Sequence, residues 1–156
     1  MPQPVSVSSR IVEALYCEAL VLSDEVRHTF VALSAPEKQT SVDKNDDVRN
    51  ANSSEGLRTT TRMMHAVAWL LNHRAYHRGE MSEFQLRRHA RLSPDMLQSE
   101  PAYCALLSPH VQNVIVMTVH FYDRLLRLDR SWRPDAEVAP GAISRLRERL
   151  ESRLAS

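Results

Sequence analysis

Hydrophobic residues recur at alternating spacings of three and four along three long segments of the chain, which is the pattern of an amphipathic α-helix. The first segment is 10–33, the second 57–77 and the third 109–130. Ser82 and Gln85 have the spacing of a capping box, so a short further helix is expected after Ser82. The pattern predicts an all-α fold, a three-helix bundle with one short extra helix.

The central segment has the densest apolar content. Met64, Ala68 and Leu71 form one stripe at alternating spacings of four and three, and Leu70 widens it. Trp69 lies at the edge of the stripe, either in the core or as a half-exposed contact. Gly79 is a natural stop, because glycine accepts the left-handed conformation that ends helices. The predicted core motif of this helix is Met64, Ala68, Trp69, Leu70, Leu71 and Gly79.

Composition divides the chain into a bundle and three polar or thinly apolar parts. Residues 1–9 are expected to be a flexible N-terminus and residues 10–132 the helical bundle domain. Within the bundle, residues 35–54 are rich in Ser, Thr, Asn, Asp and Lys, which predicts a mobile loop. Residues 133–156 are expected to be a flexible or weakly helical tail, because a short amphipathic helix alone in water is marginal.

The third long segment is apolar almost all round between Val114 and Tyr122. A helix buried on every side needs several neighbours or a second subunit. Because one chain supplies only two long partner helices, the sequence predicts a homodimer packed on this helix.

The overall composition excludes several classes of protein. The formal net charge is +1, which gives no reason for global attraction to nucleic acid. Cys17 and Cys104 lie far apart on apolar segments and are expected to be reduced and buried. No apolar run approaches the roughly 20 residues of a membrane span, so we expect a cytoplasmic protein with no membrane partner.

Two groups of residues resemble chemical sites, and neither is convincing. His73 and His77 have a metal-ligand spacing on a helix, but Arg74 stands where a zinc protease has its glutamate, so both are expected to be surface histidines. Cys104 with His110 or His120 has no local support as a nucleophile and base. With three glycines in the whole chain a phosphate loop is implausible. We therefore predict no catalytic residue, no metal and no cofactor.

Arginines give the only strong partner signal, because guanidinium groups form bidentate pairs with carboxylates and phosphates. The candidate partner-binding residues are Arg58, Arg62, Arg74, Arg78, Arg87 and Arg88. The simpler interpretation is a solvated basic face, on which the aliphatic parts of the arginine side chains cover apolar neighbours. The alternative function is a nucleic-acid-associated helical regulator using the Arg58–Arg91 basic patch. Against a nucleic-acid partner, the patch lacks interleaved aromatics and a recognition helix.

Four runs in the middle of the chain resemble a known family. They are LRTTTRMM at 57–64, AWLL at 68–71, Arg74-Ala75, and GEM at 79–81. Together they resemble the RcdA family, regulators of CtrA degradation in bacteria. The resemblance implies a dimeric three-helix bundle with a disordered C-terminal tail. It also implies a non-enzymatic adaptor that helps deliver cell-cycle regulators to the ClpXP protease, once that protease is primed by a response-regulator adaptor.

Overall fold

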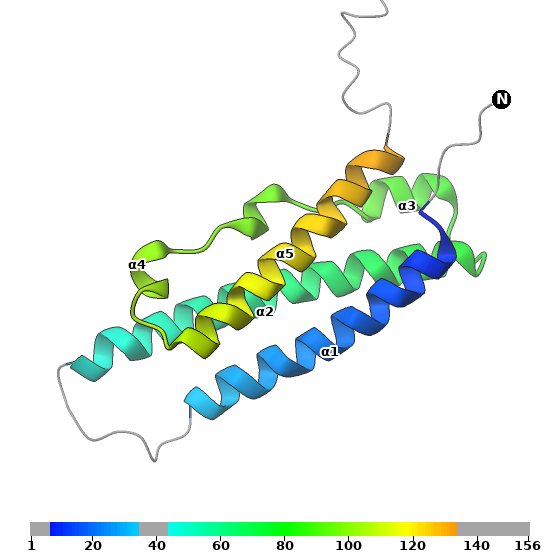
Figure 1. Ribbon diagram of the computed structural model, residues 1–156. Coiled ribbons are helices and arrows are strands. Elements are labelled where there is room, and N and C mark those ends of the chain that lie inside the picture. Colours follow the sequence, from blue (N-terminus) through cyan, green and yellow to red (C-terminus); the bar gives the residue numbers. More distant parts are fainter. Residues whose placement is uncertain (1–6, 35–43, 134–156) are drawn as a thin grey trace, which may run out of the picture.

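Three long helices pack side by side along their lengths and form the body of the molecule (Figure 1). The computed structural model describes residues 7–34 and 44–133. The long helices are α1 (Ser9–Leu33), α2 (Lys44–His77) and α5 (Pro109–Trp132). Three short elements, α3 (Glu83–His89), η2 (Pro94–Leu97) and α4 (Pro101–Cys104), connect α2 to α5. No strand occurs in the described residues, and the predicted all-α three-helix bundle is confirmed.

The core lies along the line where the three long helices meet. α1 contributes an aliphatic stripe with the predicted spacing of three and four, and α5 contributes larger side chains. A smaller cluster around Ala51, Leu107 and Val111 closes the end of the bundle next to α4. The main buried residues are Val12, Leu15, Ala19, Leu22, Val26, Met63, Ala66, Trp69, Leu70, Val114, Phe121, Tyr122, Leu125, Leu126 and Trp132.

The start of α2 corrects one prediction. The predicted mobile loop at 35–54 is wrong for residues 44–54, which form the first three turns of α2, while residues 35–43 lie outside the described residues. Helix propensity in this polar stretch is weak, but Ala51 is wholly buried against Leu107, Val111 and Ile115. Tertiary packing overrides a weak local preference here, as it does for most helices in proteins.

The buried face of α2 corrects a second prediction. Met64 is 66% exposed, Leu71 is 44% exposed and Ala68 is exposed, although all three were expected in the core. Trp69 and Leu70 are buried. At about 100° per residue, the predicted stripe lies on roughly the opposite side of the helix from the buried Ala66 and His73. α2 therefore has two apolar faces, one in the core and one outward.

The helix ends follow the expected capping chemistry in three places. Gly79 has a φ of 76°, and the hydrogen bonds after His77 form a Schellman motif. The Ser82 hydroxyl accepts from the backbone N–H of Gln85, and the Gln85 side chain accepts from the backbone N–H of Ser82, which completes a capping box. Ser108 caps α5 by accepting from the backbone N–H of Val111. Val7 is buried, so the flexible N-terminus predicted at 1–9 is wrong at that residue.

The remaining predicted tails lie mostly beyond the part that the structure describes. Residues 1–6 and 134–156 are outside it, so the prediction for the C-terminal tail concerns residues that are not described except for Arg133. Arg133 donates to the carbonyl oxygens of Arg87 and Ala90, which holds the end of α5 against α3. Within the described residues, no helix is long and apolar enough to span a bilayer.

Candidate functional site

Arg62, one of the six arginines predicted to bind a partner, lies inside the protein and not on its surface. Its side chain is wholly buried and donates to the Met96 carbonyl (2.6 Å), the Thr118 hydroxyl (2.8 Å) and the Gln98 carbonyl (3.1 Å). Burial lowers its pKa from the ordinary value. Arg62 joins α2 to α5 and to the segment around η2, so its prediction as an exposed contact residue is wrong.

Arg58 and Arg74 are held by partners within the chain. Arg58 lies 3.6 Å from the carboxylate of Glu55, which is itself wholly buried. Arg74 donates to Glu13 at 2.8 Å and lies 4.1 Å above the centre of the Tyr16 ring, and the hydrogen bond to Glu13 raises the pKa of Arg74. Arg74 therefore joins α2 to α1, whereas the Arg58 pair lies within α2.

Arg78, Arg87 and Arg88 gather at the end of the bundle that carries α3. Arg87 pairs with Glu83 at 2.7 Å, one turn earlier on the same helix. Arg78 and Arg88 are exposed and have no ion-pair partner among residues 7–34 and 44–133. The basic patch expected from Arg58 to Arg91 is therefore not one surface, because its first half is buried or paired.

A buried polar cluster lies near the C-terminal end of α5, and sequence patterns gave no sign of it. The Asp129 carboxylate accepts from the indole nitrogens of Trp69 (2.9 Å) and Trp132 (3.2 Å) and from Arg133 Nε (3.0 Å). His73 packs between the two indoles, 4.0 Å and 5.1 Å from their ring centres. Three polar contacts on one carboxylate indicate a structural centre that fixes α2 against α5.

One of the two histidines with metal-ligand spacing is placed differently from the prediction. His73, expected at the surface, is buried, and burial lowers its pKa to about 4. His77 lies within hydrogen-bonding distance of the Val7 carbonyl (2.8 Å). Within the described residues, no group of three or more His, Cys, Asp or Glu side chains is arranged to hold a metal ion.

The two thiols differ from each other in exposure. Cys17 is exposed on α1, which corrects its prediction as a buried residue, and Cys104 is half-buried. Burial raises the pKa of the Cys104 thiol and so disfavours the thiolate that a nucleophile needs.

A groove of about 680 Å³ runs between α1 and α5. Its apolar lining includes Val21, which is 73% exposed, and Met117, which is 46% exposed. One ion pair and one histidine–carboxylate contact cross it: Arg124 donates to Glu18 at 2.6 Å, and His110 lies 3.7 Å from Glu25. The groove thus has an apolar floor and a polar rim. Cys17 lies in the same lining.

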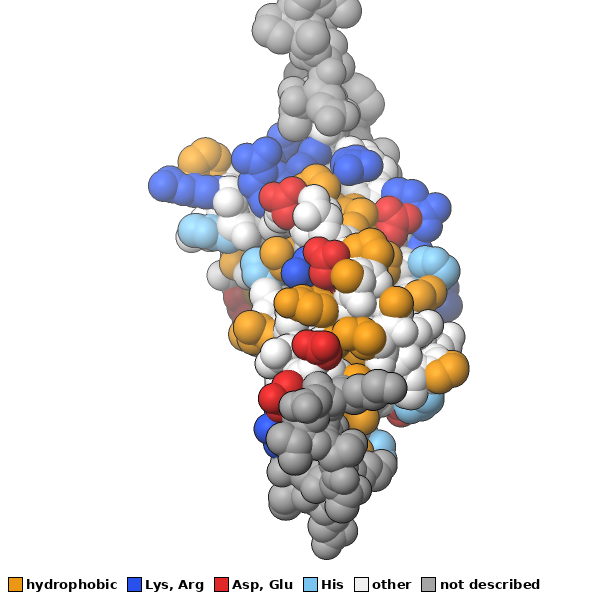
Figure 2. All heavy atoms as spheres, turned by 90° about the vertical axis from the view of Figure 1, so that its left-hand side faces the viewer, with side chains coloured by type: hydrophobic (Ala, Val, Ile, Leu, Met, Phe, Trp, Pro, Cys, Tyr) orange, Lys and Arg blue, Asp and Glu red, His pale blue; other side chains and the backbone are white. Residues whose placement is uncertain are grey.

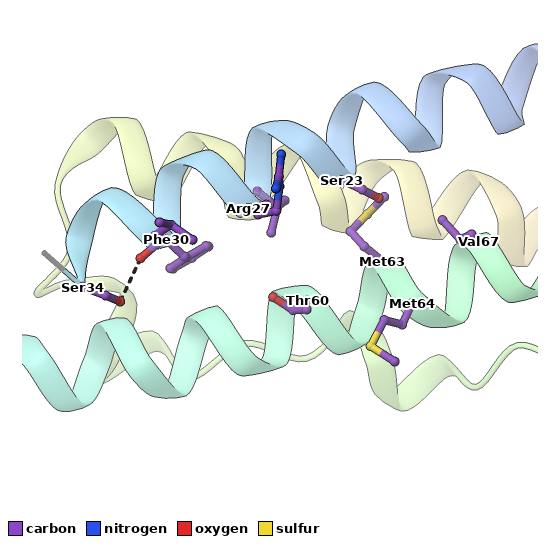
Figure 3. A pocket seen from close by; sticks show the side chains of 10 residues that line it. Ser23, Arg27, Phe30, Ser34, Thr60, Met63, Met64 and Val67 are labelled. Atoms are coloured by element: carbon purple, nitrogen blue, oxygen red, sulfur yellow. Dashed lines mark hydrogen bonds between the residues drawn. The ribbon is translucent and has the colours of Figure 1, made fainter.

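A second groove, of about 480 Å³, lies between α1 and α2 (Figure 3). Phe30 projects from α1, and Met63, Met64 and Val67 project from α2. Hydroxyl groups of Ser23, Ser34 and Thr60 lie at its margins, and the Ser34 hydroxyl donates to the Phe30 carbonyl at 3.1 Å. Met64, placed in the core by the sequence pattern, is therefore part of a surface groove.

The packing of α1, α2 and α5 defines an all-α helical-bundle protein with two apolar surface grooves. The chain belongs to the family described as protein of unknown function (DUF1465), whose model matches residues 4–154. This match corrects the resemblance to the RcdA family: the runs at 57–81 belong to a chain that is assigned over nearly its whole length to DUF1465. No curated protein and no solved structure matches the chain.

Proposed function

We propose that this chain is a non-enzymatic adaptor that binds other proteins and acts as a homodimer. The observation that carries the proposal is the α1/α5 groove, where large apolar side chains of two adjacent helices remain in contact with water. Val21 is 73% exposed, and Met117 is 46% exposed. Exposed apolar side chains that gather over a groove are typical of protein–protein interfaces.

The charge distribution along α5 supports burial of this face. No residue from Val111 to Tyr122 carries a formal charge, and His120 is the one titratable side chain apart from Tyr122. On α1, residues 19–23 are also uncharged. Interface cores are depleted in charged residues, because the free-energy cost of removing a charge from water is not offset by apolar contacts.

The pairs Glu18–Arg124 and Glu25–His110 lie where an interface has its polar rim. Both pairs are partly exposed, so they stay in water when the apolar floor between them is covered. A two-fold dimer brings the same patch of both copies together, and an uncharged floor presents no like-charge repulsion to a second copy. The α1/α5 groove therefore fits a homodimer.

An adaptor needs a second surface for its other partner, and the α1/α2 groove supplies one. Two methionines and a phenylalanine line it. Methionine is flexible and polarizable, so it adapts to partners of different shape. The most specific form of the proposal is delivery of regulatory proteins to the ClpXP protease, primed by a response-regulator adaptor. It stays a prediction, which a reconstituted degradation assay with and without the chain tests.

The solution mass tests the dimer. We expect the wild-type chain to have about twice the protomer mass of 17.8 kDa over the micromolar range. Met117→Glu places a charge on the floor of the α1/α5 groove and is expected to give a monomer. Leu57→Glu makes the same change at a side chain that is 72% exposed and lies outside both grooves, so this control should stay dimeric.

Thiol labelling gives a second readout of the same surface. Cys17 lies in the α1/α5 groove, so its reaction with a thiol reagent should slow as the protein concentration rises and the dimer forms. In Met117→Glu the rate should not depend on concentration. A wild-type chain that is monomeric at every concentration, with Cys17 always reactive, would contradict the dimer.

Capture of partners tests the adaptor role independently of the dimer. Met64→Glu, in the α1/α2 groove, should remove proteins that co-purify with the wild-type chain and leave its mass unchanged. Equal capture by wild type and Met64→Glu would exclude this groove as the second surface.

A further inference from the structure

The end of the bundle that carries α3 has more positive charge than its internal contacts use. Figure 2 shows arginine side chains gathered toward the top of the view, the level at which α5 ends in Figure 1. The exposed arginines at this end include Arg78, Arg88, Arg91 and Arg130. Among the described residues, none of these four has an ion-pair partner.

Two neighbouring arginines have structural roles that the others lack. Arg133 donates to the Arg87 and Ala90 carbonyls and pairs with Asp129, so it caps the end of α3. Arg87 pairs with Glu83 and lies 5.9 Å from the Trp132 ring centre. These contacts occupy both side chains. Arg88, in the same last turn of α3, and Arg91 beyond it are exposed and have no ion-pair partner among the described residues.

An exposed aromatic residue lies on α3 one turn before Arg88. Phe84 is 72% exposed on α3, and Arg88 follows it by four residues, so the two side chains are neighbours on one face. Leu86 and Ala90 face the core and are buried. The capping box at Ser82 and the contacts of Arg133 hold α3 in place, so the face that carries Phe84 and Arg88 is positioned before any partner binds.

We propose that this surface, Phe84 with Arg88, Arg91 and Arg130, binds an acidic segment of a partner protein that carries an apolar residue among its carboxylates. The inference rests on the proposed adaptor function and names the chemistry of one partner. Arginine suits the role because its planar group pairs with a carboxylate through two hydrogen bonds. Phe84 supplies apolar contact, which adds binding free energy that solvent-exposed charge pairs alone contribute only weakly.

The same surface fits nucleic acid poorly. α3 has seven residues and spans about 10 Å at 1.5 Å per residue, which is too short to track the several phosphates that give useful affinity. One exposed aromatic ring is also less than the stacking platform of a single-strand binder. A short acidic peptide matches this size.

Fluorescence polarisation with a synthetic peptide tests the inference. The probe is fluorescein-labelled Glu-Glu-Asp-Leu-Phe-Glu-Asp-Glu, and the comparison peptide has Gln and Asn in place of the acids. The double variant Arg88→Glu/Arg91→Glu should weaken binding about tenfold, since two exposed charge pairs become repulsive. Phe84→Ser should weaken it about fivefold through lost apolar contact.

The control reverses an exposed charge elsewhere. Arg49→Glu makes this change on α2, outside the α3 region and outside the lining of both grooves, and it should alter binding less than about twofold. Thermal unfolding of each variant shows that the fold is kept. No binding by the wild-type chain, equal binding of the neutral peptide, or equal loss in the control would overturn the inference.

A labelled single-stranded oligonucleotide separates the two classes of partner. If it binds the wild-type chain as tightly as the acidic peptide does at the same salt, and Arg88→Glu/Arg91→Glu abolishes that binding, the surface is a nucleic-acid site and the inference is wrong. Failure here is distinct from failure of the adaptor proposal, because Met117→Glu and Met64→Glu report on other surfaces.

Discussion

The side chain of Arg62 is the most informative residue to perturb, because a charged group that is wholly buried should be worth more to the fold than any arginine on the surface. It donates to two carbonyls of the segment 96–98 and to the Thr118 hydroxyl of α5, with a longer contact of 3.4 Å to the Ser99 hydroxyl. Removing it leaves those acceptors without a donor. The segment that connects α3 to α4 then loses its main attachment to α2.

The magnitude follows from the number and kind of these bonds. A hydrogen bond to a charged group contributes about 1.5–3 kcal/mol, and Arg62 makes three that are 3.1 Å or shorter. The Met96 and Gln98 carbonyls are only part-buried and regain water, so the full sum is not lost. We expect Arg62→Met, which keeps most of the apolar stem, to lower the free energy of unfolding by about 3 kcal/mol.

Urea and thermal unfolding followed by circular dichroism measure this loss. For a chain of this size, about 3 kcal/mol corresponds to a fall in Tm of about 10 °C. Arg62→Lys keeps the charge but not the planar fork, and it should still lose about 2 kcal/mol. Arg27→Met is the control, since Arg27 and its partner Asp24 are 77% and 71% exposed. It should change stability by less than about 0.5 kcal/mol.

Hydrogen exchange locates the effect within the molecule. In Arg62→Met, amides of the segment 94–104 should lose protection before those of α1, because the lost bonds tether that segment. The reasoning is refuted if Arg62→Met costs no more than Arg27→Met, or if protection falls evenly over all the helices.

Three further predictions concern the interior. Burial lowers the pKa of His73 from 6.5 to about 4, so the unfolded chain binds the proton more tightly than the folded chain does. The free energy of unfolding should therefore fall by about 2 kcal/mol between pH 7.5 and pH 5 in urea titrations. His73→Gln should remove this part of the pH dependence, whereas His65→Gln, at an exposed residue, should not. Asp129→Ala leaves two indole N–H groups and a guanidinium without their acceptor, and it should cost about 3 kcal/mol and shift tryptophan fluorescence to the red. A Cβ at Gly56 would lie 2.9 Å from the Phe30 ring, so Gly56→Val should cost about 1–3 kcal/mol in the same urea assay, and an unchanged midpoint would show that the ring moves freely.

Apolar periodicity was enough to place the three long helices, because each buries a stripe with the period of a helix. α1 was predicted within one residue at its start, and Ser108 and Pro109 mark the start of α5 in both the sequence and the structure. The polar beginning of α2 could not be read in the same way. Between residues 46 and 54 the one wholly buried apolar side chain is Ala51, which is too small to stand out in a sequence.

The inward face of α2 was mistaken because the helix has two apolar faces and the buried one contains polar residues. Glu55, Thr59, Arg62 and His73 are all buried on it. Periodicity assigns such residues to the surface, since charged side chains are rarely buried without partners. The partners of Glu55, Arg62 and His73 include the backbone of 96–100, Thr118 and the Trp132 ring, which lie 34 or more residues away in sequence.

The error had a direct effect on the candidate site. Arg62 was included with the exposed arginines because its charge and position resemble theirs, and no local signal separates a buried clamp from a solvated side chain. Phe84, Arg91 and Arg130 were not chosen as partner contacts. The exposure of Phe84 could not be foreseen, because the pattern of α3 allows an aromatic residue on either face of so short a helix.

The outward apolar stripe on α2 helps to decide which kind of partner each groove binds. Between Thr59 and His73, α2 has one formally charged residue, Arg62, and that residue is buried, so the water-facing surface of these four turns has none. The α1/α5 groove is crossed by the Glu18–Arg124 ion pair, which fixes the position of a partner and suits one constant neighbour such as a second copy. The α1/α2 groove has two methionines in its lining and one charged side chain, Arg27, which is 77% exposed and pairs with Asp24. A lining of flexible side chains with a single exposed charge favours partners of varied sequence, so cargo is better assigned to this groove than to the other.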